Sequence, residues 1–136
     1  MAATGYSGTP LVKKLGIKPE MKILVLNAPG NYFNLLEQDI TPQIITGKQV
    51  PDLIHLFAKD HPAFIKGMQQ VLKYTAANTA TIIWVSWYKK TSGMATDITE
   101  DSIRNFALQH DLVDIKVCAV SHQWSGLKLV VPVAKR

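Results

Sequence analysis

The sequence predicts a three-layer α/β domain, in which helices cover both faces of a mostly parallel sheet of six strands. Apolar, β-branched runs alternate with stretches of helical periodicity along the chain, which is the pattern of strands joined by crossover helices. The last two runs, residues 113–120 and 127–133, are separated by one short polar segment, so they are expected to form an antiparallel C-terminal hairpin. The chain has 136 residues, 47% of them hydrophobic, and no repeat or linker, which predicts a single domain over residues 1–136.

The first half of the chain carries the signals of a short helix and three strands. Thr9 suits the N-cap of the helix, Pro10 its first position and Gly16 its left-handed end. Three apolar runs then predict the first, second and third strands: residues 21–26, 41–46 and 52–57. Between the first two strands we expect a turn and one or two helical turns over residues 33–38.

The second half contains the longest helix and the clearest strand. Pro62 begins a helix that extends to about Thr75, because apolar residues recur there at helical spacing. Residues 79–87 are apolar, β-branched and aromatic, and they predict a fourth strand in the interior of the sheet. A further helix is expected from near Thr99 to near His110, ahead of the terminal hairpin.

Charge and cysteine content exclude several classes of function. The net charge of +5 arises from 15 basic and 10 acidic residues, and the basic residues are spread as pairs. Without a block of like charges, nucleic acid is not an expected partner. Cys118 is the only cysteine and the four histidines lack metal-ligand spacing, so we expect neither a disulfide framework nor a metal site.

The sequence offers no sign of export or membrane insertion. No basic segment followed by an apolar one is present at the N-terminus, and no apolar run approaches the length of a membrane span. We therefore expect a cytoplasmic protein.

A polar loop after the fourth strand is the strongest candidate for a binding site. Lysines, hydroxyls and Gly93 follow the strand at the sheet edge where open α/β folds bind ligands, and this composition suits an anion. Two other turns share the same mixture of aromatic, hydroxyl and glycine residues. Together the three segments predict one pocket whose ligand-binding residues are Tyr6, Ser7, Thr9, Trp87, Lys89, Lys90, Thr91, Ser92, Trp124 and Ser125.

These segments have a structural alternative, since Ser, Thr and Gly are also the preferred residues of ordinary turns and caps. Asp97, Glu100 and Asp101 are interpreted mainly as helix-capping groups, although an acid/base role is open. Of the histidines, only His122 in the hairpin turn is kept as an acid/base candidate.

Residues 15–26 resemble the lead-in to the first strand of S-adenosylmethionine-dependent methyltransferases, where a short helix, a glycine turn and a Lys-Pro pair precede the cofactor strand. The resemblance implies a Rossmann-like fold with strands in the order 2-1-3-4-6-5. The chain departs from that family after the first strand, because Pro29 lacks an amide donor and only Gly30 remains of the glycine-rich turn. No acidic residue ends the second strand, where the family has its ribose-binding carboxylate.

Three further motifs resemble an uncharacterised bacterial family of small proteins, known only as a domain of unknown function. The motifs are residues 6–11, residues 84–93, and residues 112–120 with 124–128. The resemblance spans nearly the whole chain and implies a truncated methyltransferase-like fold, but it brings no activity.

The leading functional hypothesis is a binding module for a small anionic ligand at the carboxyl edge of the sheet. Walker, dinucleotide and nucleophile-elbow motifs are absent from the sequence, and we expect no cofactor. One alternative is a degenerate methyltransferase-like enzyme with a cofactor cleft near Asn27 and Gly30. Another is a protein-interaction domain, either a monomer or a homodimer that pairs through a sheet edge at residues 41–46.

Overall fold

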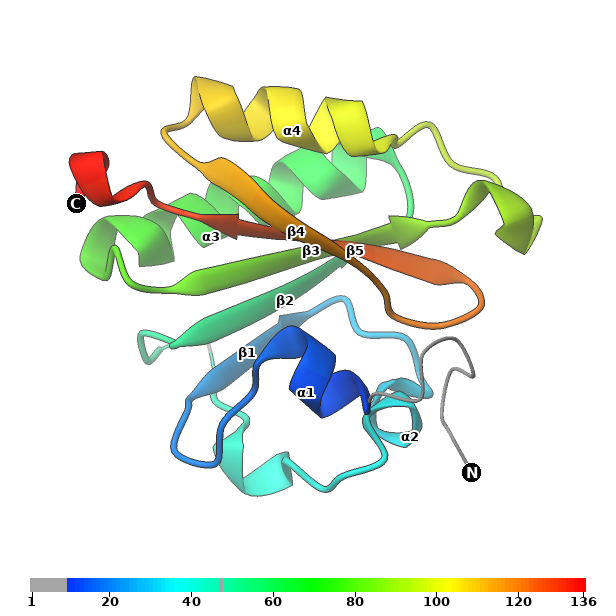
Figure 1. Cartoon of the computed structure of the whole chain (residues 1–136), viewed down its shortest axis with the longest axis horizontal. Coiled ribbons are helices and arrows are strands. Elements are labelled where there is room, and N and C mark those ends of the chain that lie inside the picture. The colour runs from blue at the N-terminus through cyan, green and yellow to red at the C-terminus, as the bar shows by residue number, and fades with distance from the viewer. Residues whose placement is uncertain (1–9, 47) are drawn as a thin grey trace.

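Five strands form one mixed sheet in the order β1-β2-β3-β5-β4 (Figure 1). The computed structural model describes residues 10–46 and 48–136. Its strands are β1 (Ile23–Leu26), β2 (Leu53–Ala58), β3 (Ile82–Tyr88), β4 (Val113–Ala119) and β5 (Trp124–Val130). β1, β2 and β3 pair in parallel, whereas β5 runs antiparallel to both β3 and β4. The carboxyl ends of the three parallel strands therefore meet at one edge of the sheet.

Helices cover both faces of the sheet, which confirms the three-layer prediction (Figure 1). The helices are α1 (Leu11–Leu15), α2 (Tyr32–Leu36), α3 (His61–Ala77) and α4 (Glu100–Gln109). Apolar side chains of α3 and α4 pack on one face, and those of α1 and α2 pack on the other. Short 3-10 helices lie at Thr41–Gln43, Lys90–Ser92 and Val133–Lys135.

The central strands are apolar or aromatic except at His55 and Ser86, because both of their faces are covered. Every residue of β2 is buried, and so is every residue of β3 after Ile82. This is the expected pattern for parallel strands between two helical layers. The prediction that residues 79–87 contain an interior strand is confirmed, since β3 pairs with β2 on one side and β5 on the other.

The predicted second strand at residues 41–46 is wrong. Pro42, which cannot donate a backbone hydrogen bond, lies within the 3-10 helix Thr41–Gln43. Only a single parallel bridge joins Ile44 to Ile23 of β1. The sheet therefore has five strands instead of six. Because residues 41–46 form no edge strand, they cannot pair two copies of the chain as the homodimer hypothesis required. The order of the other five strands agrees with the expected 2-1-3-4-6-5.

Two more expectations need correction. The sheet is mixed rather than mostly parallel, because two of its four neighbouring pairs are antiparallel. The last strand begins at Trp124, three residues before the expected start, since the connection from β4 is tighter than the polar composition suggested. The proposed N-cap Thr9 lies outside the described residues, and the helix it was expected to begin starts at Leu11.

The two longer helices begin with well-defined caps. The Asp60 carboxylate accepts a hydrogen bond from the Ala63 amide at 2.9 Å at the start of α3. Thr99 and Ser102 form a reciprocal capping box at the start of α4, with bonds of 2.9 and 3.1 Å. Neither these helices nor any other in the described part of the chain is long and apolar enough to cross a membrane.

Candidate functional site

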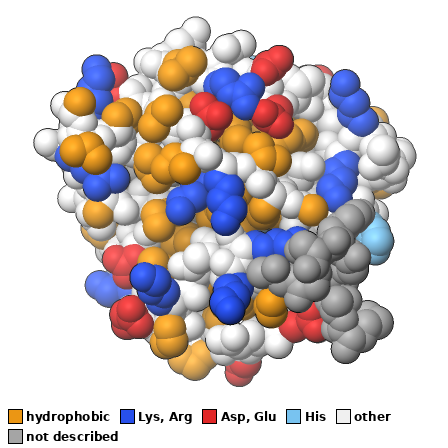
Figure 2. Space-filling view, in the orientation of Figure 1, with side chains coloured by type: hydrophobic (Ala, Val, Ile, Leu, Met, Phe, Trp, Pro, Cys, Tyr) orange, Lys and Arg blue, Asp and Glu red, His pale blue; other side chains and the backbone are white. Residues whose placement is uncertain are grey.

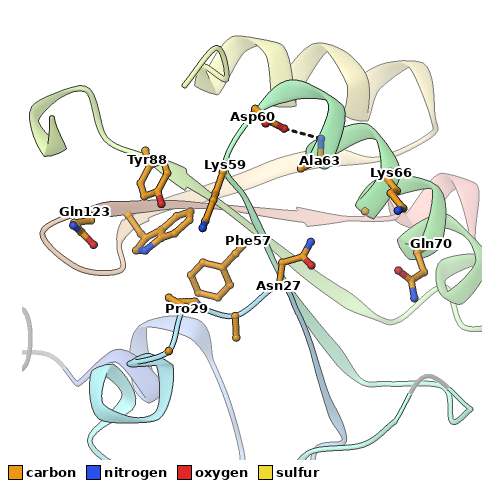
Figure 3. A pocket seen from close by; sticks show the side chains of 14 residues that line it. Asn27, Pro29, Phe57, Lys59, Asp60, Ala63, Lys66, Gln70, Tyr88 and Gln123 are labelled. Carbon is orange, nitrogen blue, oxygen red and sulfur yellow. Dashed lines mark hydrogen bonds between the residues drawn. The ribbon is translucent and has the colours of Figure 1, made fainter. Parts of the chain in front are cut away.

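A cleft of about 760 Å³ opens at the carboxyl ends of β1, β2 and β3 (Figure 3). Its walls come from the turn after β1, the β2–α3 junction, one face of α3 and the β4–β5 turn. This volume is typical of a site for a small organic molecule. The cleft lies where open α/β sheets bind ligands, beyond the carboxyl ends of the strands.

Three aromatic side chains form the floor of the cleft. Phe57 lies near the carboxyl end of β2, Tyr88 is the last residue of β3, and Trp124 is the first residue of β5. The Tyr88 and Trp124 rings stack with centroids 4.2 Å apart, and Phe57 meets Trp124 edge-on at 4.9 Å. All three are at least nine-tenths buried, so the cleft has a rigid apolar base.

Helix α3 supplies the long wall. Ala63, Lys66, Gly67 and Gln70 line the cleft, and their spacing places them on one face of the helix. Gly67 lets this helix lie close against β2, because a Cβ atom there would stand 2.5 Å from Leu56 Cδ1.

The polar groups of the cleft are mostly hydrogen-bond donors. Lys59 and Lys66 contribute ammonium groups, and Asn27, Gln70 and Gln123 contribute side-chain amides. Figure 3 shows Lys59 reaching toward Phe57, while Lys66 and Gln70 project from α3 farther along the cleft. Within residues 10–46 and 48–136 none of these five side chains has a hydrogen-bond or ion-pair partner.

Among the described lining residues, Asp60 is the one carboxylate, and it is already hydrogen-bonded. Asp60 Oδ1 accepts the hydrogen bond from Ala63 that caps α3. Asp60 forms no ion pair within the described residues, and two ammonium groups against one carboxylate leave the lining with a net positive charge. The cleft is therefore electropositive and rich in unused donors.

Asn27 turns the chain into the cleft directly after β1. Its φ of 58° lies in the left-handed region, which asparagine tolerates better than most non-glycine residues. Such backbone strain is concentrated at functional sites. Here it directs an unpartnered amide toward the cleft, as Figure 3 shows.

A buried series of three hydrogen-bonded side chains lies beneath the floor, and the sequence patterns did not predict it. Tyr32 Oη lies 3.0 Å from His55 Nδ1, and His55 Nε2 lies 2.7 Å from Ser86 Oγ. Burial lowers the pKa of His55 to about 3 and raises the pKa of Tyr32. Phe57 stacks on the His55 ring at 4.2 Å, so the chain supports the floor from below. The sequence does contain a signal for this chain, because His55 and Ser86 are polar residues within two otherwise apolar strand runs.

The lysine loop after β3 borders a second, neighbouring cleft of about 520 Å³. Five predicted site residues line it: Trp87, Lys89, Lys90, Thr91 and Ser125. Glu100 and Asp101 line it too, and both pair with Arg104. Ser92 is not in the lining, because its hydroxyl donates to Lys89 O at 2.7 Å and accepts from the Met94 amide at 3.1 Å.

Besides Ser92, only one of the remaining predicted site residues lies in the described part of the chain. Trp124 lines the carboxyl-edge cleft instead. Tyr6, Ser7 and Thr9 lie outside the described residues, so the shared three-segment pocket stays a prediction. Residues that the sequence analysis left out of the site, among them Lys59 and Lys66, dominate the larger cleft.

The acidic candidates have structural roles. Asp97 Oδ1 accepts a hydrogen bond from the His61 amide at 2.7 Å, and Glu100 and Asp101 hold Arg104. Their interpretation as helix-end groups agrees with these bonds. No cluster of three His, Cys, Asp or Glu residues within the described ranges is arranged to hold a metal ion.

Comparison with known proteins identifies the fold. No protein-family model matches the chain, nor does the sequence of any curated protein. A protein of the NADB-Rossmann superfamily from Streptococcus agalactiae matches in structure with a TM-score of 0.50 and 8% identity, over 90% of this chain and 68% of that one. An uncharacterised protein from Listeria monocytogenes serotype 4b matches with a TM-score of 0.53 and 11% identity, over 92% and 68% of the two chains.

A third structure, described as a candidate tRNA (m1A22) methyltransferase from Streptococcus pneumoniae, matches with a TM-score of 0.48 and 10% identity. That match covers 80% of this chain and 52% of the other, and no conclusion rests on it. Membership of the family of unknown function stays a prediction. The first two likenesses show that the chain has a Rossmann-like α/β fold.

Proposed function

We propose that this protein binds a small anionic ligand in the carboxyl-edge cleft. One observation carries the proposal: two ammonium groups and three side-chain amides, all without described partners, line one cleft above an aromatic floor. Exposed lysines elsewhere are readily explained as a solvated surface, but unused donors gathered in a concave site favour a ligand.

The chemistry of each side chain indicates which part of the ligand it would contact. Lys59 and Lys66 would form charge-assisted hydrogen bonds to the anionic part of the ligand, which are stronger than neutral ones. Phe57, Tyr88 and Trp124 would contact its apolar part, and the amides would set its orientation. The described lining contains no serine, cysteine or histidine, so it supports binding better than covalent catalysis.

Thermal shift and calorimetry with a panel of organic anions test this proposal. A ligand at a hundred times its dissociation constant should add about 2.7 kcal/mol to the free energy of unfolding. The double variant Lys59→Gln/Lys66→Gln should lose this stabilisation. Lys73→Gln removes an exposed lysine of the same helix away from the cleft, and should keep it. Stabilisation that is equal in all three proteins would contradict the proposal, as would none in the parent.

The methyltransferase-like alternative has one observation in its favour. The cleft lies beside Asn27 and Gly30, directly after β1, where the resemblance implies a cofactor. The residues fit S-adenosylmethionine poorly, however, since a Cβ on Gly30 would meet open space and Pro29 offers no amide. The segment expected to end in a ribose-binding carboxylate is a 3-10 helix followed by a single bridge. Thermal shift with S-adenosylmethionine and S-adenosylhomocysteine should therefore show no stabilisation, and a clear shift would restore this alternative.

A homodimer is a third candidate, and it would use the other edge of the sheet. Ile115 and Val117 on edge strand β4 are 57% and 49% exposed. Figure 2 shows apolar side chains between Lys and Arg side chains on the face where β4 lies in front. Against this candidate, Lys116 and the irregular register beside it are features that disfavour pairing of β4 with a strand of a second molecule. Light scattering over a concentration series tests this candidate, and monomer throughout would exclude it.

A further inference from the structure

The start of helix α3 is closed to anions. The His61 amide donates to Asp97, Pro62 has no amide hydrogen, and the Ala63 amide donates to Asp60. Nucleotide-binding folds hold phosphate groups on free amides at a helix N-terminus. Because these donors are occupied, the start of α3 offers no backbone amide to an anion, and the lining lysines Lys59 and Lys66 supply the positive charge.

The two lysines stand at different positions along the cleft. Lys59 precedes the N-cap Asp60, whereas Lys66 lies in the second turn of α3. A rise of 1.5 Å per helical residue places their backbones on the order of 10 Å apart. In Figure 3 the Lys59 side chain approaches the aromatic floor, and Lys66 lies at the other end with Gln70. Each ammonium group therefore has its own surroundings.

Each end of the cleft also has its own donors besides the lysine. Gln70 follows Lys66 by four residues on the same helical face, so an amide and an ammonium group can contact one anionic group together. At the other end, Gln123 lies beyond Tyr88 as seen from Lys59 (Figure 3), and it precedes Trp124 in the chain. A cleft of about 760 Å³ is far larger than one compact anion such as phosphate requires.

We infer that the ligand is an elongated organic dianion, with one anionic group at Lys59 beside the aromatic floor and the other at Lys66 and Gln70. This inference rests on the proposed function and specifies the ligand class. Dicarboxylic acids and phosphorylated carboxylic acids with an apolar middle section have this chemistry. Dinucleotides do not match it, because their charge is a central pyrophosphate and not two anionic groups at opposite ends.

Calorimetry with a matched series of probes at constant ionic strength tests the inference. The probes are butanoate and hexanoate as monoanions, and succinate, adipate and suberate as dianions of increasing length. We expect adipate or suberate to bind at least tenfold more tightly than hexanoate. Lys66→Gln should remove that advantage by weakening adipate and suberate at least tenfold, whereas Lys59→Gln should weaken hexanoate as well as the dianions. Lys73→Gln should change neither, since Lys73 lies outside the cleft.

The outcomes separate this inference from the proposed function. If monoanions and dianions bind equally well and only Lys59→Gln/Lys66→Gln weakens them, the proposed function stands and the dianion inference is overturned. If NAD binds more tightly than every dicarboxylate, the dianion inference is overturned as well. If no anion binds the parent protein, both are overturned. All three lysines are exposed, so each variant should fold, and circular dichroism provides that control.

Discussion

The imidazole of His55 bonds through Nε2 to the hydroxyl of Ser86 at 2.7 Å, and both side chains are completely buried. The two residues lie on neighbouring parallel strands, β2 and β3. Tyr32 satisfies the other ring nitrogen at 3.0 Å. A neutral imidazole has one donor and one acceptor, and two hydroxyl groups can match either tautomer. No described buried side-chain polar atom lacks a partner, so this chain is a fully satisfied network within an apolar core.

Replacing Ser86 with alanine should therefore destabilise the protein. The substitution leaves a buried ring nitrogen without a partner, which costs about 1–3 kcal/mol of unfolding free energy. Urea denaturation measures the loss. Ser125→Ala is a matched control on β5, because that hydroxyl is half-buried and has no described hydrogen bond, and it should change stability by less than about 0.5 kcal/mol. Equal effects of the two substitutions would contradict the assigned role of Ser86.

His55 should also make stability depend on pH. Its pKa is lowered by burial to about 3 in the folded protein, against about 6.5 in the unfolded chain. Below pH 6.5 the unfolded state binds a proton that the folded state does not, so acidification favours unfolding. The contribution is complete above about pH 6.5 and is lost progressively toward pH 3, with a slope of up to about 1.4 kcal/mol per pH unit.

Urea denaturation between pH 6.5 and 5 measures this slope with little interference from carboxyl groups. The variant His55→Gln should be less stable at pH 6.5, and its stability should vary less over this interval. A slope that is the same in the variant and the parent would assign the pH dependence to other groups.

The arrangement of the strands could largely be predicted from the sequence. Residues 79–87 are apolar, β-branched or aromatic except at Ser86, because β3 is buried on both faces, and that pattern is visible without coordinates. The hairpin was predicted from the short polar connection at residues 121–126. Residues 41–46 misled the prediction, since Ile44 and Ile45 gave a strand-like pattern that Pro42 prevents from pairing beyond one bridge.

The site could be predicted only in its general location. The carboxyl edge was expected from the loop after β3, but the larger cleft depends on residues that meet only in three dimensions. Lys59 follows β2 and Lys66 lies a full turn into α3, so in the sequence both look like ordinary surface lysines. Tyr88 and Trp124 stack through the antiparallel pairing of β3 and β5, which local composition does not reveal. The spacing of these residues along the chain therefore could not predict that they line one cleft.

Gly67 should be intolerant of a larger residue although it lies inside a helix. Alanine there would gain about 1 kcal/mol in helix propensity. The added Cβ would stand 2.5 Å from Leu56 Cδ1, a fully buried side chain, and such overpacking costs about 1–3 kcal/mol. We expect Gly67→Ala to lower the melting temperature by several degrees. Gly30→Ala is the control, because its Cβ would meet nothing within 4 Å. Equal melting temperatures for the two variants would show that Leu56 repacks freely.

The last prediction decides between the two neighbouring clefts. If the anion binds above the aromatic floor, Lys89→Ala/Lys90→Ala should bind the best dicarboxylate within about twofold of the parent. The fold should also persist, since the hydrogen bond from Lys89 to Gln123 uses the backbone amide and survives the substitution. Lys59→Gln/Lys66→Gln should instead lose at least tenfold in affinity and most of its salt dependence, because the ammonium groups that would contact the anion are gone. Calorimetry at two salt concentrations measures both effects. The reverse result, with binding lost only in the Lys89/Lys90 variant, would move the ligand to the lysine loop, where Trp87, Thr91 and Ser125 would complete its site.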